Sequence, residues 1–101
     1  MIRHVAVFRW RPDTSAAAVE RVTEGLRALP EAVPSLRAYH VGADLGLGED
    51  QWDYAVVADF DDAAGFLAYR AHPAHVAVLE ERILPILEAR AAVQFDPGSV
   101  R

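Results

Sequence analysis

Apolar and polar residues alternate along residues 2–10, and this alternation predicts a β-strand. One face of the strand carries Ile2, His4, Ala6, Phe8 and Trp10, and the other carries Arg3, Val5, Val7 and Arg9. Both faces are apolar in the middle of the segment. Such a pattern is typical of a strand in a sheet whose two faces are both covered.

The next segment has apolar residues at helical spacing. It predicts a helix that is capped by Asp13 or Thr14 and runs to about Leu29. Its buried stripe consists of Val19, Val22, Leu26 and Leu29. The prolines at positions 30 and 34 are expected to end this helix.

The rest of the chain predicts two strands, two helical stretches and a final strand. The strands are residues 36–44, 53–60 and 91–95; in the second, Tyr54, Val56, Ala58 and Phe60 share one face. Asp61 or Asp62 is expected to cap a helix through about Ala71, and Pro73 opens the next helix. Pro85 has no N–H for the carbonyl of Glu81, so that helix should bend or break there. Residues 96–101 are expected to form a frayed tail.

The resulting order is strand, helix, strand, strand, helix, strand, which predicts an α+β, ferredoxin-like βαββαβ fold with a four-stranded antiparallel sheet. One domain is expected to span residues 1–101. Helices cover only one face of such a sheet. The opposite face carries Val5, Val7, Ala55 and Val57, and leaving it exposed to water would be costly. We therefore expect a homodimer in which two sheets pack face to face as a dimeric α+β barrel.

Composition removes several classes of function. The chain has no cysteine, so disulfides and thiolate catalysis are excluded. Its net charge is −5 and its arginines are scattered, so we expect no nucleic-acid partner. No apolar run is long enough for a membrane span and no signal peptide is evident, so a cytoplasmic location is expected. The acidic residues at 49–53 lack the spacing of a calcium loop, and no metal site is predicted.

Four motifs carry a resemblance to a known family. They are "HVAVFRW" in the first strand, "VGADLG" at the end of the second, "ADFDDAAGFLAY" across the third strand and its helix, and "HPAH" at 72–75. Over residues 2–95 the chain resembles the stress-responsive dimeric α+β barrel (Dabb) family. The resemblance implies the same fold and the same homodimer as the packing argument.

Some members of that family are polyketide cyclases, which close a linear poly-β-ketone by an aldol condensation without a cofactor. The resemblance implies that His4, Tyr69 and His75 are the catalytic residues. The cyclases have a histidine where this chain has Tyr54, and a tyrosine where it has Leu26. Together with Trp10, these two residues are expected to shape the substrate site. The implied ligand is a small apolar, aromatic or polyketide compound.

The same residues have simpler interpretations, which remain open: alone, His75 would be a surface or capping histidine and His4 a core histidine with its hydrogen bonds satisfied. His72, before Pro73, is best explained as a helix cap. In the functional interpretation, the helix dipole disfavours the charged form of His75 at the start of a helix, so the neutral ring can accept a proton. The Tyr69 hydroxyl would then orient the ring by a hydrogen bond. The alternatives are a non-enzymatic small-molecule-binding or stress protein, and a cofactor-independent monooxygenase of similar fold. A cavity that reaches both His4 and His75 would favour the cyclase or isomerase.

Overall fold

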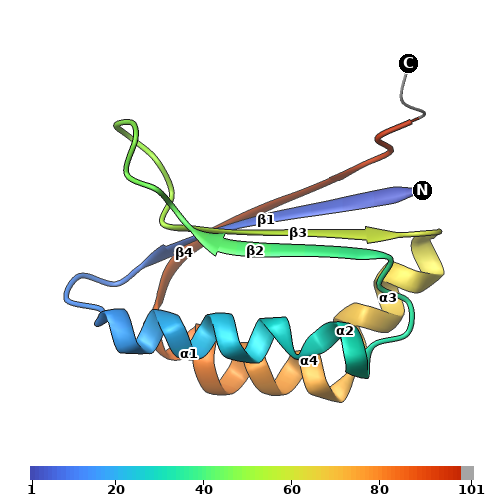
Figure 1. The fold of residues 1–101 in the computed structure, drawn as a ribbon, viewed down its shortest axis with the longest axis horizontal. Coiled ribbons are helices and arrows are strands. Elements are labelled where there is room, and N and C mark those ends of the chain that lie inside the picture. Colours follow the sequence, from blue (N-terminus) through green and yellow to red (C-terminus); the bar gives the residue numbers. More distant parts are fainter. Residues whose placement is uncertain (99–101) are drawn as a thin grey trace.

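The computed structural model describes residues 1–98, and it has the predicted ferredoxin-like architecture (Figure 1). Along the chain the elements are β1 (Ile2–Trp10), α1 (Ala16–Arg27), α2 (Leu29–Ala32), β2 (Ala38–Ala43), β3 (Tyr54–Phe60), α3 (Ala63–Ala71), α4 (Pro73–Val78), the π-helical turn η1 (Leu79–Ile83), the 3-10 turn η2 (Leu84–Ile86) and β4 (Leu87–Phe95). All strand pairs are antiparallel, and the order across the sheet is β2-β3-β1-β4. The predicted fold class is confirmed.

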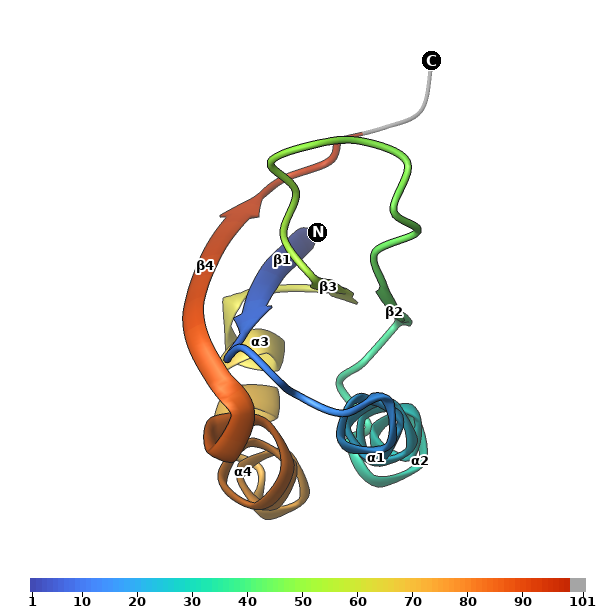
Figure 2. The same ribbon diagram turned by 90° about the vertical axis from the view of Figure 1, so that its left-hand side faces the viewer.

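The hydrophobic core lies between one face of the sheet and the helices. Figure 2 shows α1 and α4 side by side beneath the curved sheet. Every second residue of β1 and β3 points into this layer, and the antiparallel register places Ala6 beside Val56 and Phe8 beside Tyr54. The core consists of Ala6, Phe8, Trp10, Val22, Leu26, Leu29, Val33, Tyr54, Val56, Ala58, Phe60, Tyr69, Val78 and Ile83. The face predicted for His4, Phe8 and Trp10 is therefore the helix-covered one.

The start and end of the first helix differ from the prediction. Its cap is Ser15, whose hydroxyl accepts the backbone N–H of Ala18 at 3.1 Å. Asp13 instead has a φ of 65°, a left-handed turn conformation that carboxylate and amide side chains tolerate. Pro30 does not end the helix region; it lies in the first turn of α2, where a missing N–H costs nothing.

The C-terminal half also departs from the prediction at one strand. The cap of α3 is Asp62, one of the two residues expected. The helical segment ends at Ile86, directly after Pro85, as expected. β4, however, begins at Leu87 rather than residue 91. It is an edge strand with an exposed surface, so charged residues are tolerated in it and interrupt its apolar alternation. For this reason the sequence did not indicate that residues 87–90 belong to the strand.

The sheet face opposite the helices is bare in this chain. It carries the half-exposed Val5, Val7, Ala55 and Val57, as predicted from the sequence. β4 adds Val93 and Phe95 to this face, with 57% and 46% of their surfaces exposed. Within residues 1–98 no helix is long and apolar enough to cross a membrane. The frayed tail predicted for 96–101 extends beyond the described residues.

Candidate functional site

His72 joins two helices and thereby builds one wall of the candidate site. Its backbone N–H donates to the carbonyl of Tyr69 at the end of α3. Its Nδ1 accepts the backbone N–H of Ala74 at 3.0 Å, which caps α4. Pro73 supplies the first helical residue without a donor to satisfy. This tight junction brings the last turn of α3 against His75 in the first turn of α4.

A cavity of about 470 Å³ lies between the sheet and the helices and reaches both predicted histidines. His4 reaches it from β1, and His75 from α4. Its walls comprise His4, Ala6, Phe8, Leu26, Val56, Phe66, Tyr69, Arg70, His75, Leu79, Ile83, Arg90, Ala91, Ala92 and Gln94. Side chains far apart in the sequence therefore surround one largely apolar space with two imidazoles in its wall.

The imidazole of His75 has a defined tautomer. Its Nδ1 lies 3.1 Å from the carbonyl oxygen of Arg70. Because a carbonyl only accepts hydrogen bonds, Nδ1 carries the proton and Nε2 keeps its lone pair. Burial lowers the pKa of His75 below its usual value of about 6.5, and His72 adds to this, while the Arg70 carbonyl acts in the opposite direction. His75 is therefore neutral near physiological pH, with Nε2 able to accept a proton.

His4 has the complementary arrangement. The amide Nε2 of Gln94 lies 2.6 Å from its Nδ1, so the amide donates and the proton of neutral His4 is on Nε2. The ring packs against Phe66, with 5.0 Å between ring centroids. Burial lowers the pKa of His4, and repulsion from His75 lowers it further. One histidine of the cavity thus offers a lone pair on Nε2, and the other a proton.

Tyr69 does not orient His75 in the way the sequence suggested. Its hydroxyl is 2.9 Å from the hydroxyl of Tyr39 on β2. The aromatic ring instead packs on the imidazole of His75, with 4.3 Å between centroids. Burial raises the pKa of Tyr69, so the phenol stays protonated. The carbonyl of Arg70 instead accepts the hydrogen bond that orients the ring, because the junction at His72 presents that carbonyl to Nδ1 of His75.

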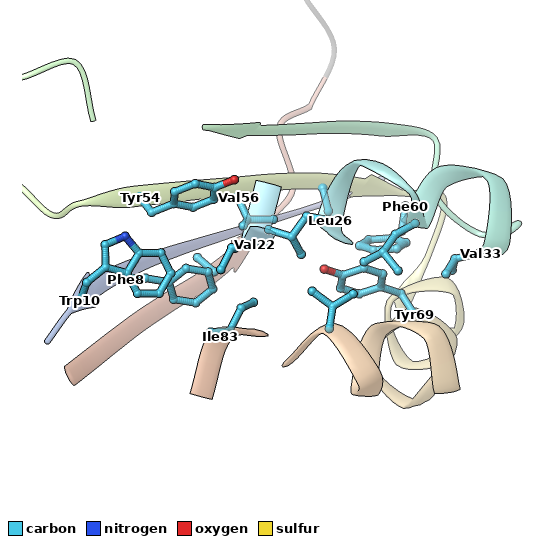
Figure 3. Close-up of a cluster of buried hydrophobic side chains, with 14 residues drawn as sticks. Phe8, Trp10, Val22, Leu26, Val33, Tyr54, Val56, Phe60, Tyr69 and Ile83 are labelled. Carbon is cyan, nitrogen blue, oxygen red and sulfur yellow. The ribbon is translucent and has the colours of Figure 1, made fainter. Parts of the chain in front are cut away.

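The three expected substrate-shaping residues separate in the structure. Leu26 is buried and lines the cavity. Tyr54 and Trp10 do not line it; they pack beside Phe8 at the far end of the core (Figure 3). The Tyr54 hydroxyl bonds to that of Thr23 at 2.7 Å, which satisfies it inside the core.

Three contributions to the site were missed by sequence analysis. Gln94 and Arg90 lie on β4 and face the helices, because the register places them opposite His4 and Phe8. Arg70 contributes both its carbonyl and a side chain in the cavity wall. Their only available signal was the alternation of residues 90, 92 and 94 along an extended β4. Within residues 1–98, no group of three or more histidine, aspartate or glutamate residues is arranged to hold a metal ion.

The family assignment follows from a match between the sequence and a family model. Residues 2–97 match the stress-responsive A/B barrel domain, Dabb. The chain belongs to the Dabb family. The resemblance of its motifs is thereby confirmed across nearly the whole sequence.

Individual proteins with known structures or curated sequences are similar to this chain. A dimeric ferredoxin-like protein of unknown function from Thermobifida fusca is 50% identical, with a TM-score of 0.87 over 93% of this chain and 88% of its own. The stress-response A/B barrel domain-containing protein HS1 of Arabidopsis thaliana is 24% identical, over 98% of this chain and 92% of its own. A hydroxynitrile lyase from Passiflora edulis is 19% identical, with a TM-score of 0.83 over 99% of this chain and 95% of its own. This last likeness concerns the fold alone.

Proposed function

We propose that this Dabb protein is a cofactor-free cyclase or isomerase that acts on a β-keto, polyketide-like compound. The observation that carries the proposal is the single cavity of about 470 Å³ reached by both His4 and His75. Both imidazoles have lowered pKa values and are neutral near physiological pH. Their opposite tautomers suit a base and a hydrogen-bond donor.

The proposed reaction uses these two tautomers in sequence. Nε2 of His75 takes a proton from a carbon between two carbonyl groups, and the electron pair of that C–H bond forms an enolate. The Nε2–H of His4 donates to the enolate oxygen as charge develops on it. The enolate carbon attacks a second carbonyl carbon of the same substrate and forms a C–C bond. The resulting alkoxide then takes the proton back from the imidazolium of His75.

The apolar walls support this chemistry. Phe8, Leu26, Val56 and Ile83 exclude water from a bound substrate and strengthen the hydrogen bonds to the enolate. The same walls also suit the second candidate, a protein that binds a small apolar ligand without converting it. The two candidates differ in whether Nε2 of His75 must be present for product to form.

The test compares the wild-type protein with His75→Ala on linear poly-β-ketoacyl thioesters and the corresponding acids. Cyclised product is measured by chromatography and mass spectrometry. Removing the general base should reduce the rate of cyclisation by about 10²- to 10⁴-fold. The matched control is His72→Asn, which keeps a helix-capping side chain at the neighbouring position.

Two results would contradict the proposal. Cyclisation by His75→Ala at the wild-type rate would remove His75 from the mechanism. If the wild-type protein binds these compounds and forms no cyclised product from any of them, the non-enzymatic binding protein is the better description.

We also propose that the chain forms a homodimer through its bare sheet face. The apolar residues of that face, which include Val57, Val93 and Phe95, are exposed in a single chain. The β2–β3 loop rises on the same side of the sheet (Figure 1), and its Leu45 and Leu47 are more than four-fifths exposed. The Thermobifida fusca protein, which is 50% identical, is described as dimeric. A second copy of this chain would cover these surfaces.

A further inference from the structure

The charges in the cavity wall are all of one sign. Acidic residues outnumber lysine and arginine in the chain, 15 to 10. Yet among residues 1–98 no aspartate or glutamate lines the cavity, whereas Arg70 and Arg90 do. The cavity is thus a locally basic site in an acidic protein, and its field attracts anions.

The two arginines reach the cavity from different elements. Arg70 lies in the last turn of α3, and Arg90 lies on β4 opposite Phe8. Among residues 1–98 the salt bridges are Arg3–Asp59 and Arg37–Asp61, so neither arginine of the cavity is paired with a carboxylate there. The guanidinium of Arg70 lies 5.9 Å from the ring centroid of Phe66, which also lines the cavity. That contact holds the charge at the rim of the apolar space.

The cavity has a charged rim and an apolar interior, which together suit a ligand with an anionic end and an apolar end. Both arginines are exposed, whereas Leu26, Val56 and Ile83 are buried deeper in the same cavity. A guanidinium presents a planar pair of donors that matches a carboxylate. We propose that Arg70 and Arg90 form an anion-binding rim, and that the natural ligand carries a carboxylate on an apolar body. The inference rests on the proposed function, in that it takes the same cavity as the substrate site and narrows the substrate to a β-keto acid.

The simpler explanation is that both arginines are solvated surface residues with no ligand. The two explanations predict different relative affinities for two ligands that have equal size and different charge. Phenylacetate and phenylacetamide are such a pair, since they share an apolar ring and differ in a carboxylate or a neutral amide. Their binding can be followed by chemical-shift changes of the His4 and His75 resonances.

The experiment measures the affinity of both probes for wild type, Arg70→Gln, Arg90→Gln and the control Arg21→Gln. Arg21 lies on α1 and does not line the cavity, so its substitution changes net charge equally. Wild type should prefer the acid by about tenfold at low salt, and added salt should reduce this preference. Each cavity substitution should lose most of the preference, while Arg21→Gln should keep it.

Two outcomes would overturn the inference. One is a wild-type protein that binds neither probe better than the other. The second is an equal loss of preference in all three variants, which would indicate net charge rather than a site. His75→Ala separates this inference from the proposed chemistry, since it should lose cyclisation and keep the preference for the acid. A chain that prefers the acid and forms no cyclised product would refute the enzyme proposal alone.

Discussion

His72 and His75 stand in one short motif and have different tasks. The Nδ1 lone pair of His72 is occupied by the N–H of Ala74, so this ring serves as a helix cap. His75 uses Nδ1–H on the carbonyl of Arg70 and keeps the lone pair of Nε2. The difference arises from which backbone group each ring meets, since the residue type is the same.

For a single residue of the site, we predict that Gln94→Glu raises the pKa of His4 by about one pH unit. A carboxylate accepts where the amide donated, so it places a proton on Nδ1 and attracts the imidazolium. NMR titration of the histidine ring resonances measures the change. Gln51→Glu, in the exposed β2–β3 loop, is the control. A wild-type His4 that titrates above the usual histidine range, or an unchanged pKa in Gln94→Glu, would contradict the assignment.

Among the elements, the helical segment after Pro73 changes its winding along the cavity. The N–H of Leu84 donates to the carbonyl of Leu79, a π-type bond, and a 3-10 turn at Pro85 follows. Because proline has no N–H, the ordinary α-helical bond to Glu81 cannot form there. Leu79 and Ile83, at the two ends of the π-turn, both line the cavity.

Close packing of α1 on this segment depends on Gly25. A Cβ at position 25 would meet Cδ of Arg82 at 3.0 Å and the side chain of Val78 at 3.2 Å. Val78 is buried and short, so it has no room to move aside. We expect Gly25→Val to lower the free energy of unfolding by about 2 kcal/mol.

Urea denaturation followed by circular dichroism tests this prediction. Glu24→Val is the control, because it introduces the same side chain at the neighbouring, exposed position of α1, where nothing packs against it. Valine is a better helix former than glycine and a worse one than glutamate, so helix propensity alone would make Glu24→Val the more destabilising of the two. Equal effects of the two substitutions would show that packing against Val78 does not set the requirement for glycine.

For the whole molecule, the helix layer and the bare sheet face have opposite roles. The helices cover one face of the sheet (Figure 2), and the cavity that His4 and His75 line is on that side. On the bare face the side chains of Arg3 and Asp59 form a salt bridge at 2.8 Å, which lowers the pKa of Asp59. A polar pair beside an apolar centre is typical of a surface that packs against a defined partner.

We predict that the protein sediments as a dimer at micromolar concentration and that Val57→Glu shifts it to a monomer. Val57 lies at the centre of the bare face, paired with Val5 and His40. A carboxylate buried at the centre of the interface should weaken association roughly hundredfold. Ala17→Glu, on the exposed side of α1, is the control and should leave the dimer intact. A wild-type monomer in sedimentation would refute the proposed interface.

Local patterns accounted for most of the fold. Alternation in residues 2–10, the capping aspartate at 62 and Pro73 each predicted an element that the structure contains. These signals are local because strand and helix periods repeat within a few residues. β4 was predicted too short because an exposed edge strand tolerates Glu88 and Arg90, which disturb its apolar alternation. The cap at Ser15 was missed because three neighbouring residues, Asp13, Thr14 and Ser15, all have side chains that can cap a helix.

The sequence by itself determined the order of elements, the two apolar faces of the sheet, the fold class and the capping role of His72. Only the tertiary structure decided that His4, Tyr69 and His75 surround one cavity and that Tyr54 and Trp10 lie apart from it. It also decided the tautomers, because the partners of the two rings are a carbonyl exposed by a helix junction and an amide on another strand. Such partners are brought together by packing between elements, and no periodicity within one segment encodes them.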